Sequence, residues 1–247
     1  MRAIELDGAH NVRELGGLAT WEGGRTRHHA LYRGDSLDAI SERDEELLFN
    51  ELHIGAVIDV RSSQEIAHAK WKDSAVRYYQ LTLLGDQEIG TRAFPNASPG
   101  RLAQVYLSNL QQGMPAVCAT FEVLALHLSA GVPCIIHCAA GRDRTGAIIA
   151  TLLAALGVCD EDIALDYVQS NVHAHQVTQR LAENPLYVNG RTADGKPVMA
   201  SAETILGFLT LLRGAYETPA HFLIESGLAA ATLTQLQMAL VEYPRSA

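Results

Sequence analysis

One segment constrains the fold of this chain more than any other: an apolar run, a glycine-containing loop and an apolar helical pattern that follow one another directly. The run is Val132–His137, the loop starts at Cys138, and the helical pattern spans Gly141–Leu156. A continuous apolar strand between helices is typical of a sheet that is covered on both faces. A helix that begins directly after a tight loop points its first N–H groups at one place, where an anion can bind. The sequence therefore predicts an α/β fold with an anion site at the start of this helix.

The rest of the chain extends this prediction. Short apolar runs predict further strands, and apolar residues at helical spacing predict helices on both sides of the central segment. We expect one domain over residues 1–247, with a central sheet flanked by helices and a helical C-terminal part. The expected strands are His29–Tyr32, Ala56–Val60 and Val76–Leu84. A helix is expected over Ile40–Leu52, with Ser41 as its cap, and two helices are expected between Pro99 and Ala130, of which Met114–Ser129 has the stronger pattern. Further helices are expected from Asp160 to Ser170 and onward to Leu181, and over Ala202–Leu212, His221–Glu225 and Thr232–Val241.

Charge and composition exclude several classes of protein. The 19 basic and 28 acidic side chains give a formal net charge of −9, whereas nonspecific binding to nucleic acid or to an anionic membrane needs a basic surface. The longest apolar stretch, Ala147–Val158, is about half the length of a membrane-spanning helix. The polar start of the chain has no apolar run of the kind that a signal peptide needs. We therefore expect no nucleic-acid partner, no stable membrane insertion and a cytoplasmic location.

The cysteines and histidines do not form a recognisable metal or redox motif. The 4 cysteines include no Cys-x-x-Cys pair, and reduced thiols are expected in a cytoplasm. His28-His29 and His173-x-His175 lack a third ligand at a recognisable spacing. Cys134 is expected to be a small core residue. The sequence predicts no disulfide, no metal and no other cofactor.

The loop after the central strand carries the chemistry. Cys138 is the candidate nucleophile, which must act as a thiolate, a form that a helix N-terminus and a nearby arginine stabilise. Five residues separate it from Arg144, so the backbone can curl around one tetrahedral phosphoryl group. Arg144 offers a planar fork for two of its oxygens. The residues expected to surround the phosphate are His137, Ala139, Ala140, Gly141, Arg142, Thr145 and Gly146; Thr145 is expected to donate its hydroxyl to the sulfur, and His137 to orient the loop through a ring hydrogen bond.

Residues 137–146 resemble the phosphate-binding loop of the cysteine-dependent protein tyrosine phosphatases, His-Cys-x-x-Gly-x-x-Arg-Thr-Gly. With Asp143 directly before Arg144, the loop is similar to that of the bacterial atypical phosphatases of the dual-specificity or phosphoinositide type. Residues 11–17 (Asn-Val-Arg-Glu-Leu-Gly-Gly), 31–35 and 58–62 are similar to further landmarks of that family. The resemblance covers most of residues 10–150 and implies a phosphatase-like fold without a metal. Val12 stands where the family usually has an aromatic residue, and Arg142 where relatives often have lysine.

The general acid is the least determined part of the site. Protonation of a departing phenolate benefits from a positioned carboxylic acid, and relatives place that aspartate in a Trp-Pro-Asp loop, which this chain lacks. The resemblance implies that Asp143 is the acid and later the base that activates water. Asp59 is the rival, although an ion pair of Asp59 with Arg61 or Arg13 that holds the end of a strand is favoured over catalysis.

The resulting hypothesis is a phosphatase that acts on phosphotyrosine, and also on phosphoserine or phosphothreonine and phosphoinositides, through a phosphorylated Cys138. Arg142 is placed to engage a second phosphate of a phosphoinositide. The alternative is a binding module that recognises phosphate with little turnover. Low-molecular-weight phosphatases and arsenate reductases also carry Cys-x5-Arg, but near the start of their chains. The polar stretch Asn184–Pro197 is predicted to be a loop, either a lid over the site or a plain surface loop. The sequence leaves the oligomeric state open.

Overall fold

A computed structural model describes residues 3–66, 76–85, 97–182, 185–187 and 196–244 of the chain. A five-stranded sheet with the order β1-β3-β6-β4-β5 forms its centre. β3, β6, β4 and β5 run parallel to one another, and β1 pairs antiparallel with β3. The strands are β1 (Arg13–Glu14), β3 (Leu31–Gly34), β6 (Cys134–His137), β4 (Ala56–Asp59) and β5 (Arg77–Gln80).

The register of the parallel strands brings their carboxyl ends together at one edge of the sheet. Gly34 and Asp59 both pair with His137, the last residue of β6. The segments that follow β3, β4 and β6 therefore leave the sheet side by side. Ligands of open α/β sheets bind at this edge, and the loop of Cys138 lies there.

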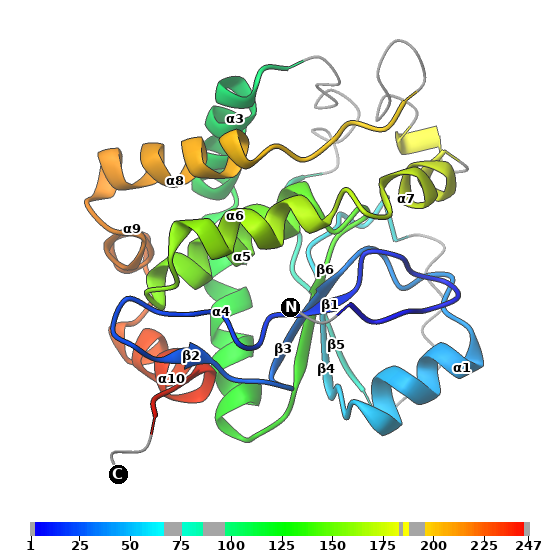
Figure 1. Ribbon diagram of the computed structural model, residues 1–247, viewed down its shortest axis with the longest axis horizontal. Coiled ribbons are helices and arrows are strands. Elements are labelled where there is room, and N and C mark those ends of the chain that lie inside the picture. The colour runs from blue at the N-terminus through cyan, green and yellow to red at the C-terminus, as the bar shows by residue number, and fades with distance from the viewer. Residues whose placement is uncertain (1–2, 67–75, 86–96, 183–184, 188–195, 245–247) are drawn as a thin grey trace.

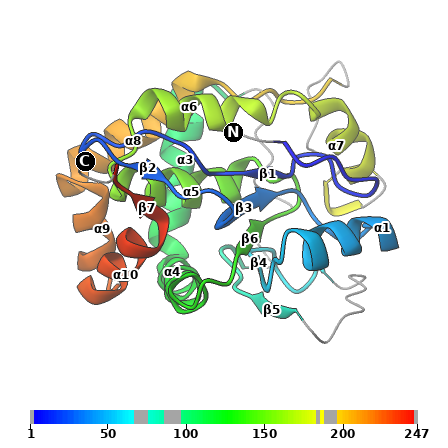
Figure 2. The same cartoon turned by 60° about the horizontal axis from the view of Figure 1, so that its bottom comes forward.

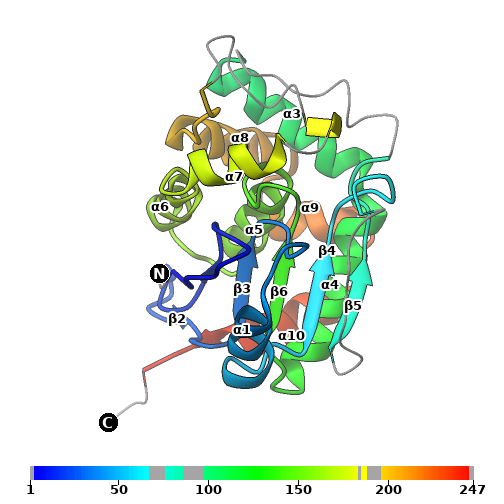
Figure 3. The same cartoon turned by 90° about the vertical axis from the view of Figure 1, so that its right-hand side faces the viewer.

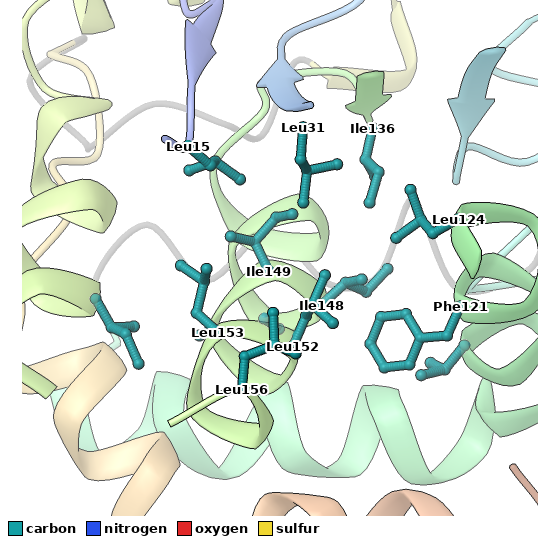
Figure 4. Packing of buried hydrophobic residues seen from close by; sticks show 14 of the residues in the cluster. Leu15, Leu31, Phe121, Leu124, Ile136, Ile148, Ile149, Leu152, Leu153 and Leu156 are labelled. Carbon is teal, nitrogen blue, oxygen red and sulfur yellow. The ribbon is translucent and has the colours of Figure 1, made fainter. Parts of the chain in front are cut away.

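Helices cover both faces of the sheet, as the sequence predicts. Figure 3 shows α1 (Glu42–Glu45) on the near face and α4 (Met114–Ser129) behind the strands. On the near face, Tyr32, Val57 and Ile135 of the sheet pack with Leu48 of η1 (Glu46–Glu51), the π-helical segment that continues α1. On the other face, the strands pack against α4 and α5 (Asp143–Ala155); the residues of this larger cluster labelled in Figure 4 include Leu31 and Ile136 of the sheet, Phe121 and Leu124 of α4, and Ile148, Ile149 and Leu152 of α5.

The remaining helices surround α5 and its neighbours. α3 and α8 pack on each other, and α5 contacts α3, α6, α8 and α9 (Figures 1 and 2). A small sheet of β2 and β7 joins the N-terminal part of the chain to its end. These elements are α3 (Pro99–Gln112), α6 (Asp160–Gln169), α7 (Ala174–Leu181), η2 (Pro185–Tyr187), α8 (Ala202–Tyr216), α9 (Pro219–Glu225), α10 (Ala230–Leu240), β2 (Arg25–Thr26) and β7 (Val241–Glu242).

The mixed α/β class, the helix over Met114–Ser129 and the cap at Ser41 are confirmed. The Ser41 hydroxyl accepts from the backbone of Asp44, whose side chain accepts from the backbone of Ser41 in return. The strand expected at His29–Tyr32 is wrong by two residues, because His29 has a left-handed backbone (φ 55°) that no strand accommodates. The helical stretch expected through Leu181 is interrupted between α6 and α7. Most of the predicted loop Asn184–Pro197 lies outside the described residues.

Candidate active site

The loop of residues 138–142 connects the end of β6 to the start of α5. Gly141 has a φ of 65°, in the left-handed region that glycine tolerates best. A Cβ atom at Gly141 would lie 2.6 Å from the backbone nitrogen of Asp35 and closer still to the carbonyl group of Gly34. Glycine at this position therefore lets the loop pack directly against the residues that follow β3.

The carbonyl groups of the loop all point into the surrounding protein. The carbonyl groups of four successive residues accept hydrogen bonds from residues outside the loop. The carbonyl of Cys138 accepts from His137 Nδ1 (3.3 Å), and that of Ala139 from the Ser36 amide (3.1 Å) and from Arg180 Nη2 (3.2 Å). The carbonyl of Ala140 accepts from Asn11 Nδ2 (2.9 Å), and that of Gly141 from Arg33 Nη2 (2.7 Å). In the described part of the chain, the backbone N–H groups from Ala139 to Arg144 have no acceptor. Together with the N-terminal end of α5, these donors suit a tetrahedral oxyanion.

Arg144, in the first turn of α5, is fixed by a carboxylate. Its Nη1 donates to Glu65 Oε2 (2.7 Å) and its Nη2 to Glu65 Oε1 (2.6 Å). The hydroxyl of Tyr187 also donates to Glu65 Oε1 (2.6 Å). Burial would raise the pKa of Glu65, but hydrogen bonds and the charge of Arg144 hold it below its usual range. Glu65 accepts hydrogen bonds from the two terminal nitrogens of the Arg144 guanidinium group. The side of that group that carries Nε is therefore available to donate to another ligand.

Asp143, the first residue of α5, lies in a polar cluster next to this arginine. Arg142 Nε is 3.1 Å from both carboxylate oxygens, Arg142 Nη2 is 2.9 Å from Oδ2, and the Tyr106 hydroxyl donates to Oδ1. Burial would raise the pKa of Asp143, but the charge of Arg142 and these hydrogen bonds lower it. Arg142 also donates through Nη1 to the carbonyl of Val198. The structure therefore ties Arg142 to Asp143 and to the chain before α8.

Asp59, at the end of β4, is committed to other groups. Arg61 donates to it from the backbone (2.9 Å) and through Nε and Nη2, and Tyr78 donates its hydroxyl (2.9 Å). Burial would raise the pKa of Asp59, but His137 and Arg61 lower it to about 2. This geometry matches the ion pair that sequence analysis favoured, and the partner is Arg61.

His137 and Cys138 are both buried. His137 Nδ1 lies 3.3 Å from the carbonyl of Cys138, which agrees with the expected ring hydrogen bond, and its Nε2 is 3.7 Å from Asp59 Oδ2. Burial lowers the pKa of His137, so the ring is neutral near pH 7. The prediction that Thr145 donates to the sulfur is wrong for this structure: the Thr145 hydroxyl is buried with no hydrogen-bond partner among the described residues. It stands in the first turn of α5, where its side chain points into the protein.

Two buried arginines support the loop from behind. Arg13 donates through Nε to Asp166 Oδ1 of α6 (2.7 Å), and Arg33 donates to the other oxygen of the same carboxylate. Arg13 also donates to Asn11 Oδ1 (2.6 Å), whose amide holds the carbonyl of Ala140. Both arginines are therefore structural: they pair with Asp166 and help to hold the loop in place.

Sequence reasoning missed several residues that shape this site. They are Asn11, Asp35, Glu65, Tyr106, Asp166 and Arg180. Arg180 of α7 contacts the loop and pairs with the buried Asp35 (2.9 Å). Local sequence around these residues has no signal that separates them from surface charges, apart from Asn11 and Asp35, which lie in two of the family landmarks.

Neither a metal centre nor a membrane span is found in the described part of the chain. Among the residues that the structure covers, no three His, Cys, Asp or Glu side chains gather as metal ligands do. No helix there combines the length and apolar character needed to cross a bilayer.

Comparisons with known proteins found a matching family model, related chains and similar solved structures. The model of a family described as the tyrosine phosphatase family matches residues 4–242. The chain is 26% identical to the triple specificity protein phosphatase PtpB of Mycobacterium tuberculosis, over 98% of this chain and 100% of that protein. It is 27% identical to a tyrosine-protein phosphatase of Nostoc commune, over 57% of this chain and 48% of that protein. The solved structure of the Siw14 catalytic core covers 75% of this chain and 96% of its own, with a TM-score of 0.38 and 13% identity.

Proposed function

The chain belongs to the tyrosine phosphatase family, and from this premise we propose that it hydrolyses phosphate monoesters through a phosphorylated Cys138, without a metal. The proposed catalytic residues are Cys138, Arg144 and Asp143. The backbone of the loop and the first turn of α5 bind the phosphoryl group.

One observation carries the proposal: the loop directs its carbonyls away and leaves its amides free. Donors that are already oriented stabilise charge on the three equatorial oxygens of a transferring phosphoryl group without reorganisation. The Nε edge of Arg144 adds a fork for two oxygens, held in place by Glu65. These groups supply the positive field that other phosphatases obtain from metal ions.

The first step transfers the phosphoryl group to sulfur. The thiolate of Cys138 attacks phosphorus, the bond from phosphorus to the leaving oxygen breaks, and Asp143 gives its proton to that oxygen. Asp143 is ionised at rest because Arg142 and Tyr106 donate to it. A bound phosphate dianion raises the pKa of a nearby carboxyl, since like charges disfavour ionisation. Binding of substrate therefore prepares Asp143 to carry the proton.

The second step returns the enzyme to its starting state. Water attacks phosphorus, the phosphorus–sulfur bond breaks, and the ionised Asp143 takes a proton from the water. The products are inorganic phosphate and the Cys138 thiolate. The same carboxyl thus serves as acid and then as base.

Phosphotyrosine is the proposed principal substrate, with phosphoserine or phosphothreonine and phosphoinositides as further ones. The name of the M. tuberculosis relative, a triple specificity protein phosphatase, supports a broad range of substrates. Arg142 lies within the loop whose backbone N–H groups are proposed to bind the phosphoryl group, but its guanidinium donates hydrogen bonds to Asp143 and to the carbonyl of Val198. We expect Arg142→Ala to slow phosphoinositide turnover more than phosphotyrosine turnover; an equal loss on both would exclude a second-phosphate role.

The test measures phosphate release from a phosphotyrosine peptide and from phosphoinositide vesicles in the presence of EDTA. Wild type is compared with Cys138→Ser and with Cys134→Ser as the matched control. Cys134 begins β6, the strand that ends just before Cys138; it is fully buried and contacts the carbonyl of Val132 (3.5 Å), a bond that serine can also make. Burial raises the pKa of Cys134 to about 12, so it supplies no thiolate. Only Cys138→Ser is expected to abolish release.

Two outcomes would overturn the proposal. Release that survives in Cys138→Ser would exclude the thiol mechanism. Binding of phosphotyrosine peptide by folded wild type without any release would favour the alternative, a module that recognises phosphate.

A further inference from the structure

Two buried tyrosines from different helices form a chain of hydroxyl groups that ends at the carboxyl group of Asp143. Tyr106 of α3 donates its hydroxyl to Asp143 Oδ1, and the hydroxyl of Tyr167 of α6 lies 2.6 Å from that of Tyr106. Tyr106 is 3% exposed and Tyr167 is 2% exposed. Burial raises the pKa of both tyrosines, so each keeps its proton. Because the single proton of Tyr106 goes to the carboxylate, Tyr167 must be the donor to Tyr106.

The position of Tyr167 depends on a glycine of the loop motif. Gly146 lies one helical turn after Asp143, so both residues are on the same face of α5. A Cβ atom at Gly146 would lie 3.0 Å from two ring carbons of Tyr167. The absence of a side chain lets the ring approach the helix. The Tyr167 ring makes an edge contact with the ring of Tyr106 (centroids 6.3 Å apart), which in turn makes an edge contact with Phe208 (6.2 Å). The second glycine of the motif thereby helps to place a hydroxyl relay.

We propose that Tyr106 and Tyr167 are positioning residues that fix the Asp143 carboxyl and set the pH range over which it acts as an acid. The inference rests on the proposed function, in which Asp143 carries the proton. Donation to Oδ1 holds one rotamer of the carboxyl and directs its proton to Oδ2. Donation also favours the ionised form, so each hydroxyl in the relay makes Asp143 easier to ionise.

Other charged groups act on the same carboxyl. Arg142 donates to both of its oxygens, and Arg144 lies in the same helical turn; both favour ionisation. From β3, the guanidinium of Arg33 adds positive charge near Tyr167. Burial would lower the pKa of Arg142 and of Arg144, but their carboxylate partners raise it, so both stay charged near neutral pH. Tyr106→Phe therefore removes one hydrogen-bond donor to the Asp143 carboxylate and leaves the arginines in place. The pKa of Asp143, and with it the basic limb of the rate profile, should move upward.

The experiment compares the pH profiles of kcat for wild type, Tyr106→Phe and Tyr167→Phe on phenyl phosphate and 4-nitrophenyl phosphate. A phenolate is the poorer leaving group, so its departure depends more on the acid. For Tyr106→Phe we expect the basic limb on phenyl phosphate to move up by about one pH unit. We also expect kcat on that substrate to fall about tenfold, with KM within about twofold and a smaller loss on 4-nitrophenyl phosphate. For Tyr167→Phe we expect the same shift of the basic limb and the same fall in kcat, but both smaller.

The matched control is Tyr79→Phe. Tyr79 bonds to His127 (2.9 Å) on the sheet edge away from the loop, so this variant loses a hydroxyl without touching the relay. Its profile should coincide with that of wild type. Equal losses on both substrates with an unmoved basic limb would show that the tyrosines serve folding alone, and would overturn the inference.

A direct titration separates this inference from the proposed function. The ¹³C resonance of the Asp143 carboxyl, assigned by its absence in Asp143→Asn, should titrate at a higher pH in Tyr106→Phe than in wild type. An unchanged midpoint would overturn the inference even in an active enzyme. Absence of phosphate release from wild type would instead refute the proposed function, whatever the titration shows.

Discussion

Asp166→Asn tests whether the phosphate loop depends on buried charge pairs behind it. The Asp166 carboxylate accepts from Arg13 through one oxygen and from Arg33 through the other. The three side chains are 1%, 5% and 1% exposed, in that order. Asparagine keeps the shape of the side chain and removes its charge, so two buried guanidinium groups lose their shared counterion.

The expected cost follows from that burial. Removal of one partner from a buried ion pair destabilises a protein by about 3–5 kcal/mol, because the remaining charge is left without compensation. For a chain of this length, each kcal/mol lowers Tm by about 2–4 °C, so the expected fall is ~6–20 °C. Arg33 also donates to the Gly141 carbonyl, so phosphate affinity should fall with stability.

Differential scanning calorimetry and vanadate inhibition measure the two effects, with Asp160→Asn as the matched control. Asp160 lies on the same helix and makes two similar bonds to Arg213 (2.6 and 2.7 Å), but its side chain is 30% exposed. An exposed pair contributes about 0–1 kcal/mol. Asp160→Asn should therefore lower Tm by a few degrees at most and leave inhibition by vanadate unchanged.

The sign of the pH dependence provides a further check. Although burial would raise the pKa of Asp166, Arg13 and Arg33 lower it, so its contribution to stability is present above the usual aspartate pKa of about 3.9. That contribution is lost as the pH falls through the lowered folded-state value. The difference in Tm between wild type and Asp166→Asn should become smaller only in this acidic range. Equal Tm losses for the two aspartate variants at pH 7 would refute the reasoning.

Three further substitutions test other parts of the site. Glu65→Gln removes the charge that fixes Arg144, so kcat/KM should fall about tenfold or more through the loss of a charge-assisted bidentate contact. Tm should fall as well, because the Glu65 side chain is buried and its removal leaves Arg144 without a counterion; unchanged kinetics would exclude the positioning role of Glu65. Gly141→Ala forces alanine into φ 65° and against Gly34, so we expect a loss of about 2 kcal/mol or more in a urea titration, together with loss of vanadate inhibition. Asp59→Asn should lower stability above about pH 4, with the difference lost as the pH falls toward the folded-state pKa of about 2; an unmoved basic limb of the rate profile would confirm that Asp59 is not the acid.

Local patterns account for the elements that were predicted well. The helix over Met114–Ser129 and the strand that ends at His137 follow from apolar periodicity, and the start of α1 follows from the Ser41 cap. These features depend on residues a few positions apart. The same holds for the loop after Cys138, where the order of residue types along ten positions indicates the chemistry.

Elements with weak or very short patterns were missed. β1, β2 and β7 have two residues each, too few for a period to be recognised. The shift at His29 arises from a left-handed residue that its own sequence does not demand. The break between α6 and α7 carries neither glycine nor proline, so no local signal marks it.

The amino-acid order alone thus determines the α/β class and the family, and it predicts the chemistry of the Cys138–Arg144 loop, because each depends on neighbouring residues. Folding decides which distant groups complete the site. Glu65 meets Arg144 across 79 positions, and Arg13 meets Asp166 across 153. The parallel strands β4 and β6 bring the segments of Glu65 and Arg144 to one edge of the sheet. The packing of α6 places Asp166 beside Arg13, and burial forces the charges of both pairs together. Nothing near Glu65 or Asp166 in the sequence distinguishes them from solvent-exposed acids, since burial and partner are properties of the folded chain.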